Sequence, residues 1–343
     1  MLNVVLTFDY EIFFGKNNAT ETDILFKPTS RILDLLDKSK LTGTFFADVC
    51  SVNTYKKENM YSDYPRLFNE QIREMAIKGH DVQLHIHSHW ITAKYDQNQK
   101  QWRIDPRTYR IHHFLEENNG SANRIIQEGI QYLTSTIKEV DEGYQCYAYR
   151  AGGYCIQPET ELFHLLAENG IEIDSSVCIG KKLQSEAHDF DYDKQYKQLN
   201  WRTDSGIIEI PIGSTPNSLF KRMIPSSGYR TLDKEPAKGE GIQGTTAPST
   251  SKIQRVLNFN KTKREFGLEF IHYKQLMAGL RRYYDQYSKA GKDVFVATNC
   301  HPKSMDSISM QNMELFFHEI EENGDWVRFV SMKEARNKLK GAL

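Results

Sequence analysis

The residues best suited to chemistry are histidines and carboxylates that stand at a few points of the chain. His85, His87 and His89 fall together in the segment His-Ile-His-Ser-His. On a continuing strand all three would face one side, whereas a helix-like bend would bring His85 and His89 together and turn His87 away. Imidazole nitrogens bind zinc, cobalt, nickel or iron, so either geometry predicts a site for a divalent metal.

Two carboxylates near the N-terminus can complete such a site. Asp9 and Glu11 belong to the segment Thr-Phe-Asp-Tyr-Glu, which ends an apolar run of strand length. Alternate residues of an extended chain lie on one side, so these two acids reach a common site while Tyr10 points elsewhere. Beside a metal, one such acid binds the ion and the other takes a proton from its water.

Four more polar residues stand at or near the ends of apolar segments. Arg150 precedes two glycines and can hold a carboxylate through a bidentate pair, which lowers the pKa of that carboxylate. His301 precedes a proline and suits a positioned acid or base. Asp174 and Glu209 are single acids for which a structural role is an equal expectation. Trp90, Trp201 and Tyr154 are candidates for sugar-facing walls, although core packing is the stronger expectation for any single one of them.

Short apolar segments that alternate with amphipathic ones must position these side chains. Strands are predicted at residues 2–8, 43–49, 81–87, 145–149, 171–173, 206–212 and 293–298, with helices after most of them and a last strand and helix at 327–340. This alternation favours a parallel sheet. The candidate residues fall at the C-terminal ends of different strands, where barrels carry their active sites, so we expect a closed barrel rather than an open doubly wound sheet.

Composition excludes several other classes of protein. The chain of 343 residues is 39% hydrophobic with a formal charge of −1, and no polybasic tract indicates a nucleic-acid partner. No segment approaches the roughly 18 apolar residues of a membrane span, and no export signal precedes the first strand, which predicts a cytoplasmic location. The five cysteines show no paired spacing and predict neither disulfides nor a thiolate zinc site.

The chain is expected to form one domain over residues 1–343 with an irregular insertion at about 215–265. Within it, Ser226–Ser251 is rich in glycine, proline, serine and threonine, which predicts a mobile loop. Two interpretations stay open for this loop, namely a surface excursion and a lid that orders over substrate.

In this order, the motifs resemble those of the NodB-homology polysaccharide deacetylases, the family-four carbohydrate esterases. The segment Thr7–Glu11 is similar to the first motif of that family, whose leading aspartate is the catalytic base, here Asp9. The segment His85–His89 is similar to the second, whose two outer histidines bind the metal. The resemblance also implies a distorted (β/α) barrel of about seven parallel strands.

The three later motifs follow in the same order. Arg150-Ala-Gly-Gly-Tyr154 resembles the third, in which the arginine orients the base and a backbone amide near Tyr154 stabilises the oxyanion. Asp174 stands in a segment similar to the fourth, where an aspartate supports that network. Asn-Cys-His301-Pro resembles the fifth, where the histidine is the general acid. Trp90 and Tyr154 are the residues that we expect to contact substrate.

Departures from these patterns indicate a divergent branch. The usual first motif has a second aspartate as metal ligand, and Tyr10 stands at that position. Some relatives space the two acids as Asp9 and Glu11 are spaced, so Glu11 is the expected ligand together with His85 and His89. Ile86 and the glycine pair after Arg150 also differ from the common motifs. The expected metal is zinc, with cobalt, nickel or iron as alternatives.

The resemblance implies a metal-dependent hydrolase that removes an N-acetyl group from a sugar. Its expected substrate is a glycan intermediate of surface-polysaccharide biosynthesis. Two alternatives remain, a metal-dependent amidohydrolase that acts on a non-sugar C–N bond and an inactive glycan-binding module. An amidohydrolase normally carries its His-x-His pair on the first strand, whereas His85 and His87 follow about the third.

Overall fold

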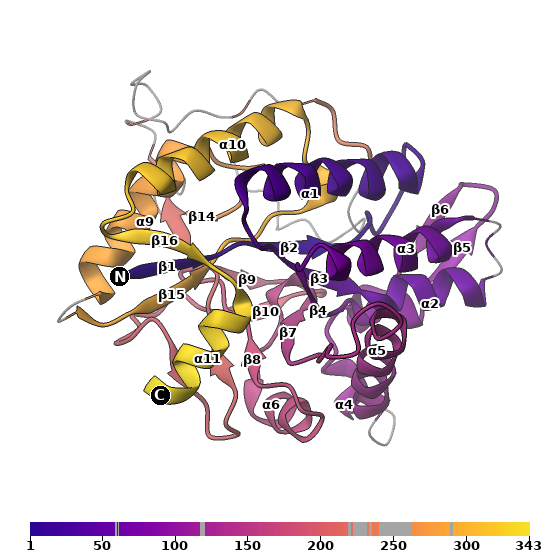
Figure 1. Ribbon diagram of the computed structural model, residues 1–343. Coiled ribbons are helices and arrows are strands. Elements are labelled where there is room, and N and C mark those ends of the chain that lie inside the picture. The colour runs from indigo at the N-terminus through magenta and orange to yellow at the C-terminus, as the bar shows by residue number, and fades with distance from the viewer. Residues whose placement is uncertain are drawn as a thin grey trace, which may run out of the picture.

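Mostly parallel strands form the centre of this α/β fold (Figure 1). The computed structural model describes residues 1–58, 60, 62–116, 121–218, 221, 232, 235–239, 262–288 and 291–343. A seven-stranded sheet has the order β11-β12-β8-β7-β4-β3-β2, in which only the β11–β12 pair is antiparallel. Its strands are β2 (Thr7–Tyr10), β3 (Thr44–Asp48), β4 (Asp81–Ile86), β7 (Ala148–Ala151), β8 (Ile173–Asp174), β11 (Trp201–Arg202) and β12 (Ile208–Glu209).

A second, three-stranded parallel sheet has the order β15-β1-β16, with β1 at Leu2–Val5, β15 at Val294–Ala297 and β16 at Val327–Val330. The strand expected over residues 2–8 is therefore divided at Leu6 between the two sheets. Isolated parallel bridges, Phe8 to Cys300 and Ile212 to Ala297, connect the sheets. Among the described residues, the strands form two parallel sheets joined by single bridges, so the expected parallel α/β architecture is confirmed and closure into a barrel stays a prediction.

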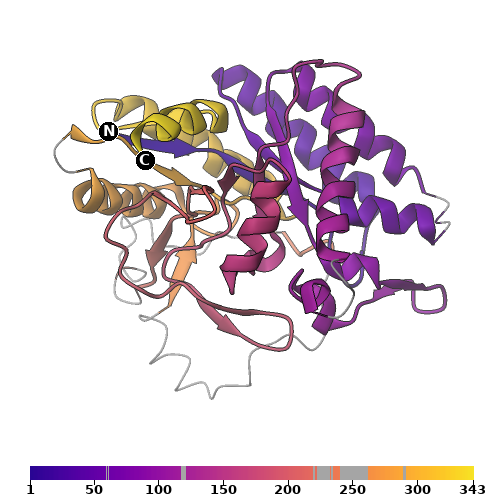
Figure 2. The ribbon, with the colours of Figure 1, turned by 90° about the horizontal axis from the view of Figure 1, so that it is seen from below.

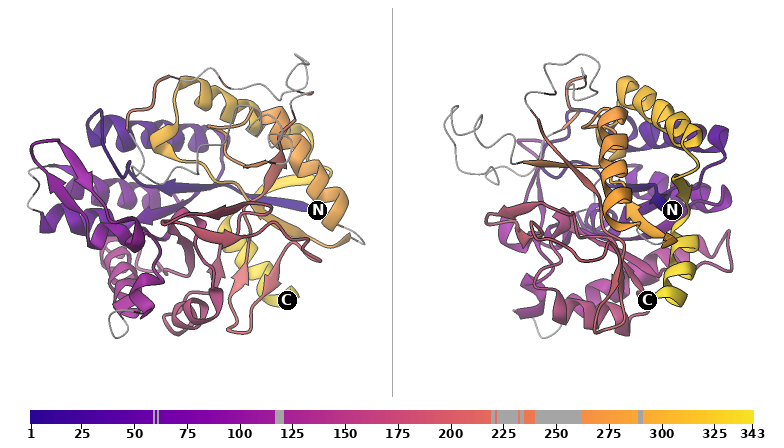
Figure 3. Two further views of the ribbon diagram at one scale, coloured as in Figure 1. Left: turned by 180° about the vertical axis from the view of Figure 1, so that it is seen from behind. Right: turned by 90° about the vertical axis from the view of Figure 1, so that its left-hand side faces the viewer.

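Helices lie around the outside of these strands, as the views in Figure 3 show. They are α1 (Lys27–Ser39), α2 (Val49–Lys57), α3 (Tyr64–Ile77), α4 (His113–Glu116), α5 (Ser121–Ile137), α6 (Glu159–Glu168), α9 (Tyr273–Tyr287), α10 (Ser307–Glu322) and α11 (Met332–Ala342). Figure 2 shows the N-terminal helices, in violet, and the C-terminal helices, in orange and yellow, toward opposite ends of the molecule. The predicted alternation of strands and helices is thereby confirmed.

The strands that carry the candidate residues are buried. All residues of β2 and β3 are buried. Phe8 of β2 and Phe45 of β3 stack with ring centroids 4.8 Å apart. On the outer side of β4, a Cβ at Gly129 of α5 would lie only 2.8 Å from Leu84, so the glycine permits close helix–strand packing. This packing holds β4, and with it His85, against the sheet.

Three antiparallel hairpins were not expected from the sequence. They are β5–β6 (Lys94–Asp96 and Gln101–Arg103), β9–β10 (Lys182–Gln184 and Asp189–Asp191) and β13–β14 (Ser214–Pro216 and Lys263–Glu265). The last pair joins the two ends of the predicted insertion at 215–265. Most of the predicted loop Ser226–Ser251 lies outside the described residues. Among the residues described, no helix combines the length and apolar character that crossing a membrane requires.

Candidate active site

The candidate residues come from adjacent parallel strands. Neighbouring strands β2, β3, β4, β7 and β8 all run in one direction, so their C-terminal ends meet at one edge of the sheet. Arg150 of β7 lies opposite His85 of β4 in the strand register. The loop after β15 reaches the same edge, because the backbone N–H of Asp9 donates to the carbonyl of Cys300 at 2.9 Å. The candidate residues of β2, β4, β7 and β8 and of the loop after β15 therefore lie at one edge of the sheet.

Arg150 is held in place at this edge, because its side chain is fully buried and all five of its N–H groups have acceptors. Nη1 donates to Oδ1 of Asp9 at 2.8 Å and to Oδ1 of Asn299 at 2.6 Å. Nη2 donates to the hydroxyls of Thr7 and Ser175, and Nε donates to the Ser175 carbonyl. The guanidinium therefore has one orientation, and it holds Asp9 in one orientation too.

The carboxyl group of Asp9 is kept ionised by its neighbours. Burial alone would raise the pKa of Asp9, but the positive charges of Arg150 and of two nearby histidines outweigh it and lower the pKa below its ordinary value. A buried carboxylate that keeps its charge is able to accept a proton, which is what the sequence analysis expected of Asp9.

Glu11, His85 and His87 form a cluster of possible metal ligands. One ligand atom of each lies within 4.8 Å of those of the other two, and all three side chains are buried. Oε2 of Glu11 lies 3.2 Å from Nε2 of His85 and 2.5 Å from Nε2 of His87. One carboxylate and two imidazoles are a donor set that suits zinc and related divalent ions. The residues present therefore fit a metal.

The ring of His85 is oriented by the protein. Its Nδ1 lies 2.8 Å from the carbonyl oxygen of Arg150, so Nδ1 carries a proton and donates to it, while Nε2 faces Glu11. A metal-binding histidine usually has its second nitrogen held in this way. Burial alone would lower the pKa of His85, but the carboxylates of Asp9 and Glu11 outweigh it and raise the pKa to about 9.

His87, and not His89, completes the cluster. The extended backbone of β4 continues to His87, which places its side chain on the same side as His85. A 3₁₀-helix at Ser88–Ile91 then turns the chain, and the ring of His89 stacks on Tyr109 with centroids 5.1 Å apart and an interplanar angle of 4°. This cluster therefore differs from the ligand set that the motif resemblance implies, in which His89 stands in place of His87, and the identity of the third ligand stays a prediction. Burial is the main cause that lowers the pKa of His87 to about 4.

Lys303 is a cation at this cluster that the sequence analysis missed. Its Nζ lies 2.5 Å from Oε1 of Glu11 and 4.2 Å from the ring centroid of Phe14. Burial would raise the pKa of Glu11, but Lys303 and His87 outweigh it and hold that pKa well below its ordinary range. Glu11 therefore offers Oε2 to the histidines and Oε1 to the lysine.

His301 lies beside both acids of the first motif. Its Nε2 is 3.5 Å from Oδ2 of Asp9 and 3.9 Å from Oε1 of Glu11. Its Nδ1 and its backbone N–H both contact Oε1 of the fully buried Glu269, each at 2.8 Å. Burial lowers the pKa of His301, but Glu269 and the two acids outweigh it and raise the pKa above its ordinary value. A histidine that holds its proton suits the expected role of general acid.

Asp174 lies behind this network rather than in it. Its two carboxyl oxygens accept from the hydroxyl of Ser176 at 2.7 Å and from the backbone N–H of Ser176 at 3.0 Å. The same hydroxyl accepts from the N–H of Ala151, next to Arg150. Glu209 pairs with Asp174 in the strand register, and burial together with the Asp174 charge raises the pKa of Glu209 well above its ordinary value. Through the Ser176 hydroxyl, Asp174 therefore supports the backbone beside Arg150.

The two aromatic residues expected to contact substrate have different surroundings. Tyr154 is partly buried, and its hydroxyl accepts from Nδ2 of Asn299 at 2.7 Å, so it borders the Arg150 network. Trp90 is fully buried and packs against Trp102 with ring centroids 5.1 Å apart. Its ring is thus enclosed by protein and presents no face to a sugar.

Sequence reasoning missed three acidic or basic groups at this edge, Lys303, Glu269 and Asp48. Asp48 ends β3 and accepts from the backbone N–H of His87 at 3.3 Å, and burial raises its pKa to about 7. Asp48 stands near the end of a predicted strand, and this position could have identified it as a candidate. Glu269 stands outside the motifs and shows no comparable signal. Lys303 stands directly after the His301-Pro pair of the fifth motif, which was a usable clue.

Comparison with known proteins supports the resemblance. The sequence model of the family described as polysaccharide deacetylase matches residues 3–132, which include the first two motifs. No curated protein sequence matches the chain.

Solved structures of similar fold also include proteins of this kind. A Mycobacterium smegmatis protein assigned as a polysaccharide deacetylase has 14% identity and a TM-score of 0.48, covering 99% of this chain and 91% of that chain. The PuuE allantoinase has 12% identity and a TM-score of 0.47, covering 98% and 89%. A family 4 acetyl xylan esterase from Clostridium thermocellum, solved with a cobalt ion, has 14% identity and a TM-score of 0.37, covering 99% and 92%. At these identities and TM-scores, none of the three likenesses carries a conclusion about this chain. The match of the polysaccharide deacetylase model to residues 3–132 confirms the resemblance that the first two motifs indicated.

Proposed function

We propose that the chain is a metal-dependent hydrolase that removes an N-acetyl group from a sugar or glycan. The observation that carries this proposal is the meeting of two groups at one strand edge: an ionised Asp9 held by Arg150, and the ligand cluster around Glu11. His301 lies between the two acids, 3.5 Å from Asp9. A base, a metal site and an acid within reach of one another are what hydrolysis of an amide requires.

The proposed metal ligands are Glu11, His85 and a third imidazole. The geometry favours His87 for the third, with His89 as the alternative that the motif resemblance gives. Zinc is the first choice and cobalt, nickel or iron follow, because imidazole suits all of them. When bound, the ion supplies Lewis-acid polarisation of the acetyl carbonyl and of the attacking water.

The residues of the chain supply the proton transfers. Asp9 accepts a proton from the attacking water, and Arg150 keeps the carboxylate turned toward the site through their 2.8 Å hydrogen bond. His301 donates a proton to the departing amine, and Glu269 holds the ring for that transfer through Nδ1. Tyr154 borders the site, and a backbone amide near it is our candidate donor to the oxyanion. The products are acetate and a free amino sugar.

We propose that the isolated bridges at Cys300 and Ile212 complete a distorted barrel of about seven parallel strands, since they lie between the two parallel sheets. A role in surface-polysaccharide biosynthesis and a cytoplasmic location stay predictions.

The test couples metal content to acetate release. Elemental analysis and an acetate assay on N-acetylated oligosaccharides and sugar nucleotides would be applied to the wild type, Glu11→Gln and Asp9→Asn. We expect about one metal per chain and acetate release in the wild type, loss of metal in Glu11→Gln, and retained metal without turnover in Asp9→Asn. Asp34→Asn, an exposed position on α1, is the matched control and should behave as wild type.

Each other outcome has a definite meaning. Full activity of Asp9→Asn would show that another group is the base. Metal without acetate from any sugar would favour an amidohydrolase that acts on a non-sugar C–N bond. Absence of metal together with sugar binding would favour a glycan-binding module.

A further inference from the structure

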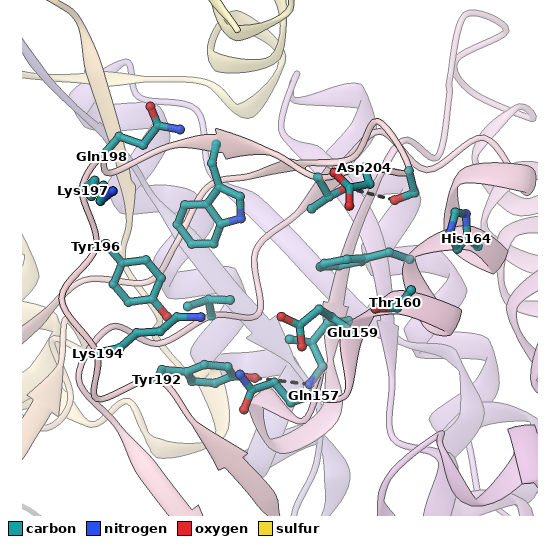
Figure 4. Close-up of a pocket in the computed structure, with 16 residues that line it drawn as sticks. Gln157, Glu159, Thr160, His164, Tyr192, Lys194, Tyr196, Lys197, Gln198 and Asp204 are labelled. Atoms are coloured by element: carbon teal, nitrogen blue, oxygen red, sulfur yellow. Dashed lines mark hydrogen bonds between the residues drawn. The ribbon is translucent and has the colours of Figure 1, made fainter.

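A cavity of about 450 Å³ lies beside α6 and the segment 192–205, and its lining includes none of the candidate metal ligands or proton-transfer groups (Figure 4). Its floor is apolar, because the lining residues Ile156, Phe163 and Tyr192 are each at most 5% exposed. On one side Tyr196 and Trp201 stack with ring centroids 5.1 Å apart and an interplanar angle of 19°. This size and apolar lining fall within the range of small-molecule sites, which extends from roughly 300 to 1,000 Å³.

Polar side chains line the same cavity with balanced charge. Glu159, at the start of α6, and Asp204 bring two carboxylates, while Lys194 and Lys197 bring two ammonium groups. Figure 4 shows Glu159 projecting toward the middle of the pocket from the helix side. Because the charges cancel, the lining does not select an anion or a cation. It offers both donors and acceptors, which is what a ligand with several hydroxyl groups needs.

The hydroxyl of Tyr196 gives a second sign of a polar ligand. Its oxygen is buried and has no hydrogen-bond partner among the described residues. Burial is the main cause that raises the pKa of Tyr196 above its ordinary value. A buried hydroxyl without a partner is energetically unfavourable, and a hydrogen bond to a ligand hydroxyl in this pocket would satisfy it.

The pocket is separate from the candidate active site. The hydroxyl of Tyr192, on the pocket floor, donates to the carbonyl of Tyr154 at 2.5 Å. The other end of Tyr154 accepts from Asn299 in the Arg150 network. Tyr154 and Tyr192 therefore stand between the two sites, and the lining includes none of the candidate ligands or proton-transfer groups.

We propose that this pocket binds a neutral sugar unit, at a site distinct from the candidate active site. The apolar faces of Tyr196 and Trp201 suit the C–H faces of a sugar ring, and the carboxylates, the amide of Gln198 and the Tyr196 hydroxyl suit its hydroxyl groups. This inference does not depend on the proposed deacetylase activity, because binding in this pocket requires neither metal nor turnover.

Binding of defined oligosaccharides tests the proposal. Tri-N-acetylchitotriose, xylotriose and maltotriose would each be titrated calorimetrically into the full chain after treatment with a chelator. The variants are Trp201→Ala, Glu159→Gln and Tyr196→Phe, and the matched control is Glu161→Gln, an exposed α6 glutamate that does not line the cavity. We expect saturable binding of at least one oligosaccharide and at least a tenfold weaker affinity in Glu159→Gln and Trp201→Ala.

If Trp201→Ala does not fold, the conservative substitutions Glu159→Gln and Tyr196→Phe still test the proposal. Tyr196→Phe removes only the hydroxyl and should weaken binding severalfold, whereas Glu161→Gln should bind as the wild type does. Binding that persists unchanged in Glu159→Gln and Tyr196→Phe would place the sugar elsewhere and overturn the proposal. Failure of all three oligosaccharides to bind would overturn it as well, whatever the result of the acetate assay.

Discussion

Arg150 and Asp9 are 141 residues apart in sequence, yet Nη1 of the arginine donates to Oδ1 of the aspartate at 2.8 Å within the buried edge of the sheet. The two side chains come from β7 and β2, which are separated in the sheet by β3 and β4. The guanidinium therefore extends across the strand ends to hold the candidate base. The remaining donors of Arg150 are bound to Asn299, Thr7 and Ser175.

Replacement of this arginine by lysine is expected to damage both the fold and the chemistry. Lysine has three N–H donors on a flexible chain and cannot reproduce the planar set of five. We expect Arg150→Lys to lower the free energy of unfolding by about 3–5 kcal/mol, the range for breaking a buried ion pair. The measurement is urea unfolding, with Arg66→Lys on exposed α3 as a control that should change it by less than about 1 kcal/mol. Equal stability of wild type and Arg150→Lys would contradict the anchoring role.

The same substitution predicts a shift in the pH profile. Arg150 helps to hold the pKa of Asp9 below its ordinary value, and a lysine keeps the charge but not the fixed guanidinium contact, so the weaker contact should raise that pKa. The base is active only when ionised, and the acidic limb of kcat/KM should therefore move to higher pH in Arg150→Lys. An unmoved limb would mean that Asp9 is not the group that titrates there.

The identity of the third metal ligand is tested by two single variants. We expect His87→Ala to weaken metal affinity by at least about 100-fold, because a direct ligand contributes more than the 10–100-fold typical of groups that only support one. His89→Ala should weaken it less than about tenfold, because the His89 ring stacks on Tyr109 outside the cluster. Equilibrium competition with a chromogenic chelator gives both values, and His318→Ala on the exposed face of α10 is the control. The reverse order of effects would favour the ligand set implied by the motif resemblance.

Lys303 is expected to act as a counterion to Glu11 when no metal is bound. Lys303→Met leaves this buried carboxylate with one cation fewer, and we expect the metal-free variant to be less stable by about 3 kcal/mol. Added Zn²⁺ should then raise the Tm of Lys303→Met more than that of the wild type, because the ion replaces the missing charge. Thermal unfolding with and without Zn²⁺ measures this, with the exposed Lys38→Met as the control. Equal Zn²⁺-induced shifts in both proteins would refute the counterion role.

His188 is expected to make the fold sensitive to acid. Burial, with smaller effects of Lys181 and Arg110, lowers the pKa of His188 from 6.5 to about 4. Between these values the unfolded chain binds a proton that the folded chain does not, so stability falls as pH decreases from 6.5 toward 4. In His188→Asn the decrease in unfolding free energy between pH 7 and pH 4.5 should be smaller by about 2 kcal/mol. Urea unfolding at both pH values decides this, and parallel losses in the two proteins would exclude the effect.

The sequence by itself determined the alternation of elements and the placement of the motifs. Apolar periodicity located helices such as α3, α5 and α9 to within a few residues, because each buries one face locally. It also placed Asp9, His85 and Arg150 at or near the ends of parallel strands, since a strand needs only a short apolar run. Those side chains lie close together because the C-terminal ends of parallel strands meet at one edge.

Only the tertiary structure decided how the site is assembled. The division of the first predicted strand at Leu6 depends on which strands pair with each half. The first half, β1, pairs with strands near the C-terminus, as the pairing of Val4 with Val296 illustrates, whereas the second half, β2, pairs with β3. The choice of His87 over His89 in the cluster depends on where β4 ends and a 3₁₀-helix begins. Lys303 reaches Glu11, and Trp90 is enclosed, only through contacts between distant segments. Such contacts leave no local pattern, because side-chain periodicity reports which face of an element is buried and not which residue lies opposite it.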